Sequence, residues 1–92
     1  MYALERRTLA NWVAANELTR LRLAQRQEIG KPITESHKAN RLYMANRQWL
    51  VERKISKTDT PMLHRVEVDV FELQEGEKIG PFEHMTAFIG RN

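Results

Sequence analysis

The segment TLANWVAANELTRLRL, residues 8–23, restricts the possible folds of this chain more than any other part of it. Nine of its sixteen residues are apolar, and at about 100° per residue they surround a helix instead of forming one stripe. A single sheet covers only one stripe of a helix. The opposite side of such a helix must therefore meet solvent, a loop of the same chain or another molecule.

The helix that contains this segment is predicted to be long. Residues 3–27 contain no Gly or Pro and consist mainly of good helix formers, and Gly30 and Pro32 follow shortly after them. We therefore predict one helix over about residues 3–27, roughly 36 Å long at 1.5 Å per residue.

Two apolar stripes run along opposite sides of this predicted helix. The side with larger residues holds Tyr2, Leu9, Trp12, Val13 and Leu23, and the side with smaller ones holds Ala3, Ala10, Ala14, Leu18 and Leu21. Large side chains fill the gap of about 10 Å above a sheet, whereas small ones allow a second helix to approach closely. We therefore expect Leu9, Trp12 and Val13 to face the sheet of this chain.

The small stripe is then the expected contact surface for a helix of another subunit. The predicted partner-binding residues are Ala10, Ala14, Glu17, Leu18, Arg20 and Leu21, with Glu17 and Arg20 at the rim. The reverse assignment stays open, because Trp is also a common interface anchor.

The rest of the chain changes to the period of β-strands. Val66, Val68 and Val70 alternate with charged residues, and Trp49 begins a similar alternation after a hairpin signal at Asn46. We expect Trp49 to meet Trp12 in the core. The other predicted segments are a loop over 28–40, strands within 41–92, a turn over 57–61, a Gly- and Pro-containing connection over 74–83 and a last strand over 84–89. The fold class is α+β, with one long N-terminal helix on a small antiparallel sheet in a single domain, residues 1–92.

The charge of the chain gives weak evidence about partners. The net charge is +3 with a pI near 9.6, because 15 Lys and Arg are offset by 12 Asp and Glu. Arg20 and Arg22 point to different sides of the predicted helix, so they form no continuous basic stripe. A small basic nucleic-acid-binding module nevertheless stays the alternative function at this point.

Neither catalytic, cofactor-binding nor metal-binding residues can be assigned. The chain has no Cys, and the three His residues, at positions 37, 64 and 84, lack the spacing of a metal site. Glu67 and Asp69 share a predicted strand face, but Arg65 beside them favours a solvated charged surface over a calcium site. No Ser or Thr lies in a nucleophile elbow and the Gly residues form no phosphate-binding motif. We expect no enzyme activity and no cofactor.

The order of the helix residues resembles a known family. The pattern T-L-A-x-W-V-A-x-N-x-L-x-x-L-R-L over 8–23, after Glu5-Arg6-Arg7, is similar to the helix signature of minor pseudopilin I of bacterial type II secretion systems. Residues 45–49 resemble the small-Gly-Arg-x-Trp hairpin of that family, 65–68 its valine-rich strand and 86–90 its closing segment. Asn46 replaces the usual Gly of the hairpin, and Val51 stands where a second Trp is common.

The resemblance implies a structural role. It implies a pseudopilin fold and a periplasmic domain, anchored to the inner membrane, at the tip of the secretion pseudopilus. The implied partners are minor pseudopilins J and K, with pseudopilin H and the major pseudopilin G as further candidates, and the assembly supports export of folded proteins. No run of the sequence reaches the roughly 18 apolar residues of a membrane span.

The family's leader and membrane helix are missing from the sequence, so we expect that the first half of the helix has been removed and replaced by Met1. Residues 1–7 should then protrude with few contacts.

Overall fold

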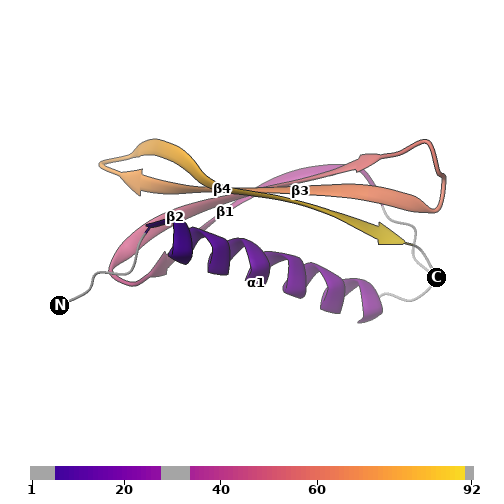
Figure 1. The fold of residues 1–92 in the computed structure, drawn as a ribbon, viewed down its shortest axis with the longest axis horizontal. Helices are drawn as coiled ribbons and strands as arrows, with labels where there is room; N and C mark the ends of the chain where they lie inside the picture. Colours follow the sequence, from indigo (N-terminus) through magenta and orange to yellow (C-terminus); the bar gives the residue numbers. More distant parts are fainter. Residues whose placement is uncertain (1–5, 28–33, 91–92) are drawn as a thin grey trace.

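The computed structural model describes residues 6–27 and 34–90. Within these ranges the chain forms one helix and one four-stranded antiparallel sheet of strand order β1-β2-β3-β4. The elements are α1 (Arg6–Gln27), β1 (Ser36–Met44), β2 (Arg47–Lys57), β3 (Leu63–Gln74) and β4 (Glu77–Gly90). The helix lies along one face of the sheet, and the two layers form a domain about 47 Å long and 17–22 Å across (Figure 1). The predicted α+β class with a helix on an antiparallel sheet is confirmed.

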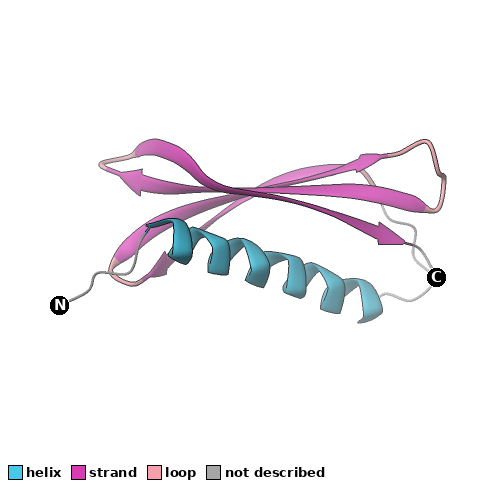
Figure 2. Ribbon diagram, viewed as in Figure 1, coloured by secondary structure: helices cyan, strands magenta, loops and turns pink. Residues whose placement is uncertain are grey.

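Two tight hairpins connect the strands at the end of the sheet where α1 begins (Figure 2). In the first, Ala45 and Asn46 both have positive φ, 53° and 60°, which is typical of a two-residue type I′ turn. In the second, Glu75 and Gly76 have φ of 50° and 82°. The first hairpin confirms the turn that Asn46 predicted, because Asn tolerates the left-handed conformation.

Two segments that were predicted as loops are strands. Ser36–Asn40 belongs to β1, and the connection predicted over 74–83 is mostly the first half of β4. Polar side chains suit β1, because this edge strand is largely exposed to solvent. In β4 the pairing with β3 moves by two residues, from Val70↔Glu83 to Glu72↔Ile79, and this bulge accommodates Gly80 and a cis bond to Pro81.

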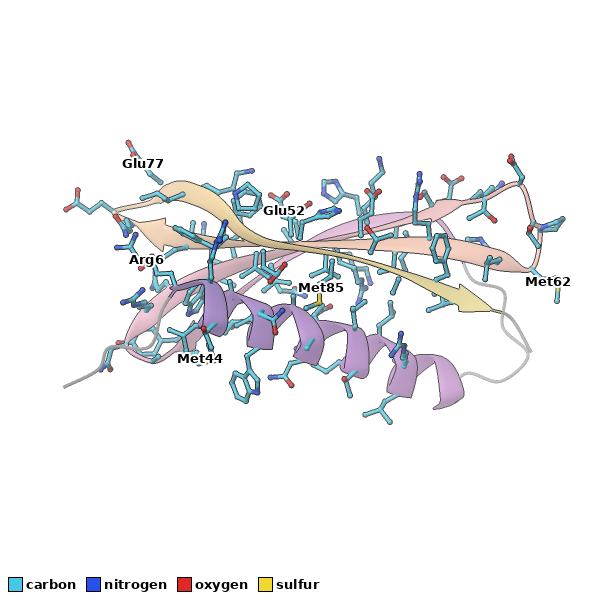
Figure 3. All side chains as sticks on the ribbon, viewed as in Figure 1. Arg6, Met44, Glu52, Met62, Glu77 and Met85 are labelled. Carbon is cyan, nitrogen blue, oxygen red and sulfur yellow. The ribbon has the colours of Figure 1, made fainter. Side chains whose placement is uncertain are left out.

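The core lies between α1 and the inner face of the sheet. The inner-face residues of β3 are the predicted Val66, Val68 and Val70, all without exposed surface. Met85 of β4 lies between helix and sheet, whereas Glu52 projects from the opposite, open face (Figure 3). Most contacts of α1 are with β4 and β3. The helix therefore covers one side of the sheet and leaves the β1 side less covered.

The predicted rotation of the helix is wrong. Leu9 and Val13 are buried as expected, but Ala10 and Ala14 are also fully buried, and Trp12 is 57% exposed. Trp12 therefore does not meet Trp49, which is fully buried and donates its Nε1 hydrogen to the carbonyl oxygen of Met44 at 3.2 Å. The buried stripe is centred between the two predicted stripes, because small side chains allow the helix backbone to approach the sheet closely.

Candidate interaction surface

The outward side of α1 carries two large apolar side chains. Trp12 is 57% exposed and Leu23 is 52% exposed. They lie eleven residues apart, which is about three helical turns, so both point away from the sheet. Exposed single apolar residues are ordinary, but a Trp on a helix next to a groove is a frequent interface anchor.

A groove of about 410 Å³ runs between α1 and the end of β1, and we name it the α1–β1 groove. Its lining residues are Trp12, Val13, Asn16, Glu17, Thr19, Arg20, Leu42, Tyr43 and Met44. Met44 lies at the hairpin end of the sheet, beside the first turns of α1 (Figure 3). Tyr43 is 69% exposed, and Leu42 and Met44 are only partly buried against the core. The groove thus combines apolar walls with access from solvent.

Glu17 lines the groove on the helix side and is buried, whereas it was predicted at a rim. Its Oε2 accepts a hydrogen bond from Nη1 of Arg53 of β2 at 3.0 Å. Nη1 of Arg20 lies 3.9 Å from Oε1 of Glu17, and the Arg20 side chain is exposed. A buried carboxylate needs such partners, since leaving it unpaired would cost several kcal/mol, roughly 3–5. Glu17 therefore joins helix to sheet.

A second buried carboxylate, Glu72 of β3, joins the start of the helix to the sheet. Nε of Arg6 lies 3.2 Å from its Oε1, and Nη1 of Arg47 lies 3.9 Å from the same atom. The Arg6 guanidinium also stands over the ring of Phe82 at 5.6 Å. The expectation that residues 1–7 protrude with few contacts is therefore wrong for Arg6; residues 1–5 lie outside the described part.

The six predicted partner-binding residues differ in how much of their surface is exposed. Ala10 and Ala14 have no exposed surface in the single chain, Leu18 and Leu21 are partly buried against its core, and of the six only Arg20 is exposed. The residues that sequence reasoning missed are Trp12, Leu42, Tyr43 and Met44. The run Leu42–Met44 next to a hairpin signal could have indicated an apolar patch, but its position beside the helix depends on the sheet order.

The open face of the sheet carries a polar cluster. Nδ1 of His84 lies 2.6 Å from Oδ1 of Asp69, and Nε2 of His84 lies 3.2 Å from Oγ1 of Thr86. The cluster is partly exposed, and Glu67 beside it pairs with Arg65 at 3.6 Å. Among the described residues no three His, Asp or Glu side chains are placed to hold a metal ion. The solvated charged surface expected for Glu67 and Asp69 therefore stays a prediction.

Within the described part of the chain, no helix has the length and apolar content that crossing a membrane requires.

Comparison with known proteins agrees with the geometry. The family model for type II secretion system (T2SS), protein I matches residues 4–89, which is nearly the whole chain. No curated protein and no solved structure matches the sequence significantly. One helix packed on a four-stranded antiparallel sheet is also the arrangement expected of a pseudopilin. The chain therefore belongs to the family of type II secretion system protein I, the minor pseudopilin I.

Proposed function

We propose that this chain is the periplasmic domain of a minor pseudopilin at the tip of the type II secretion pseudopilus. It would assemble there with minor pseudopilins J and K, and pseudopilin H and the major pseudopilin G would follow along the fibre. A helix preceding α1 would anchor it to the inner membrane, and the assembly would support export of folded proteins. The family membership supports a structural role in secretion, without catalysis or cofactor.

The observation that carries this proposal is the exposed Trp12 beside the α1–β1 groove. A Trp side chain buries roughly 150–250 Å² when it is covered. Covering the exposed part of Trp12 would therefore stabilise a complex by about 2–3 kcal/mol at roughly 25 cal/mol per Å². We infer that a helix of a neighbouring pseudopilin lies against Trp12 in this groove. Arg20, which lines the groove, keeps its proposed place at the rim of the contact, whereas Leu18 and Leu21 do not line this groove.

The test is the binding of Trp12→Ala to purified periplasmic domains of pseudopilins J and K. Because Trp12 is mostly outside the core, we expect a nearly unchanged melting temperature. We expect affinity to fall by at least about tenfold, as for a central interface residue. The matched control is Phe88→Ala, which removes another half-exposed aromatic residue, 55% exposed, from the open face of the sheet. Wild-type affinity of the Trp12 variant would contradict the proposal.

The nucleic-acid-binding alternative gains no support from the described residues. Arg20 lies beside Glu17, and Arg53 and Arg47 are occupied by buried carboxylates. We therefore carry only the pseudopilin role forward.

A further inference from the structure

The two edges of the sheet differ in how they are protected. Among the described strands, β1 pairs with β2 only and β4 with β3 only, so both have an unpaired side. The β4 edge contains the bulge and Pro81, features that discourage pairing with another strand. By contrast, β1 runs for nine residues without Pro, Gly or a register shift. The β1 edge is therefore the better template for an added strand.

The turn of the first hairpin determines which backbone groups of β1 face outward. In a two-residue hairpin, the pair that flanks the turn exchanges hydrogen bonds, and this pair is Met44↔Arg47. Bonded and non-bonded pairs then alternate along the strand. His37, Ala39, Arg41 and Tyr43 consequently direct their N–H and C=O groups away from β2. These four residues form a regular row of unpaired donors and acceptors, which we call the outer β1 row.

The charges of β1 are all of one sign. The strand holds His37, Lys38 and Arg41 and no acidic residue. Lys38 stands opposite Arg53, whose own charge is paired with Glu17, and His37 stands opposite Lys54, so β2 places no acidic residue directly across from these two side chains. Among the described residues, no carboxylate lies within ion-pair distance of either Lys38, which is on the inner face, or Arg41, which is on the open face. A negative side chain on the open face would therefore meet Arg41 without competition from an acid of this chain.

The two faces of β1 differ in polarity near the hairpin. Leu42 and Met44 share the inner face with Trp49 and line the α1–β1 groove. His37 and Arg41 lie on the open face, where Arg41 stands opposite Leu50. A strand that alternates acidic and apolar residues would match both faces, since its side chains point alternately to each.

We propose that β1 accepts an extended segment of another protein as a fifth strand, with acidic side chains on the open face and apolar side chains on the inner face. The main chain of the segment would bond to the outer β1 row. A second copy of this chain is a poor occupant, because pairing β1 with itself would place two Lys and two Arg in one ladder without an acid. The proposal concerns the sheet edge and holds whether or not a helix occupies the α1–β1 groove.

The first test uses the full chain and a nine-residue peptide that alternates Val and Glu, with a Val–Lys peptide as the charge-reversed probe. Amide hydrogen exchange is followed residue by residue. We expect the Val–Glu peptide to slow exchange at Ala39, Arg41 and Tyr43 by about tenfold or more. Asn40 should change little, because its N–H already bonds to β2. Protection of β4 instead, absence of any protection, or equal protection by the Val–Lys peptide would overturn the proposal.

The second test compares two charge reversals of equal size. Arg41→Glu should weaken binding of the Val–Glu peptide by about tenfold, since it replaces attraction by repulsion at the open face. Arg22→Glu on the exposed outer side of α1 is the control and should bind like the wild type. Equal weakening by both variants would mean that only net charge attracts the peptide, and the proposed strand pairing would be wrong. Circular dichroism confirms that both variants are folded before binding is compared.

Discussion

Ala14 shows how a single small side chain decides which side of α1 meets the sheet. It is fully buried over the inner face, together with Ala10, whereas the neighbouring Ala15 is exposed. Sequence reasoning placed the bulky Trp12 inward because bulk was expected to fill the gap above a sheet. The structure shows the reverse, since the small Ala10 and Ala14 are fully buried between helix and sheet and Trp12 is 57% exposed. Leu9 and Val13 were placed correctly because they flank these two alanines.

The residue-level prediction uses this difference between two adjacent alanines. Ala14→Arg introduces a long cation into the packed interface between helix and sheet, where the nearby buried carboxylate of Glu17 is already paired with Arg53. We therefore expect the free energy of unfolding to fall by at least about 3 kcal/mol, which is close to the whole stability of a small domain. Ala15→Arg should remain folded, with a change within about 0.5 kcal/mol. Urea denaturation followed by circular dichroism measures both. Equal stability of the two variants would show that Ala14 is not in the core.

The sequence predicted a strand correctly where one face of the strand is apolar and the other polar, and it failed where the two faces are alike. The strict alternation of β3 identified Val66, Val68 and Val70 as core residues. The first half of β1 was missed because an edge strand with solvent on most sides has no apolar period. The first half of β4 was missed because Gly80 and Pro81 are typical of a turn, and nothing local indicates that a bulge will absorb them. The groove was missed because it needs the order of the strands.

The bulge of β4 gives the prediction for this element. Gly80 has φ of +123°, and a Cβ added there would lie 2.8 Å from the backbone nitrogen of Phe82. Gly80→Ala should therefore cost about 2–3 kcal/mol from strain and a backbone clash. Gly76→Ala is the control, because Gly76 also has positive φ, +82°, but a Cβ there would meet nothing within 4 Å. We expect it to cost about 1 kcal/mol in thermal denaturation. A Gly80 variant no less stable than the Gly76 variant would contradict this account.

In the whole molecule, helix and sheet share one core and should unfold together. Leu9 and Val13 pack against the valines of β3, and Glu17 and Glu72 bind across the two layers. Separating the helix from the sheet would expose the apolar face of both layers to water. We therefore expect the two layers to unfold in one cooperative, two-state transition.

This cooperativity can be measured in the variant Trp12→Phe, in which Trp49 is the remaining Trp. The urea midpoint from helical circular dichroism should coincide with the midpoint from Trp49 emission, because the helix covers the core in which Trp49 is buried. Midpoints that differ by more than the fitting error would show that α1 leaves the sheet before the sheet unfolds.

The two buried carboxylates also have a mechanical consequence. Glu72 holds the first turn of α1 through Arg6, and Glu17, eleven residues further along the helix, holds β2 through Arg53. A force along the helix axis would have to break both ion pairs at the same time. It would also have to displace Ala10 and Ala14 from their packing against the sheet. Sliding the helix to its next equivalent position requires about 5.4 Å, one full turn, and a shift of that size separates each charge from its partner. The domain therefore resists axial slip between its layers, so a load applied at one end of α1 is passed directly into the sheet.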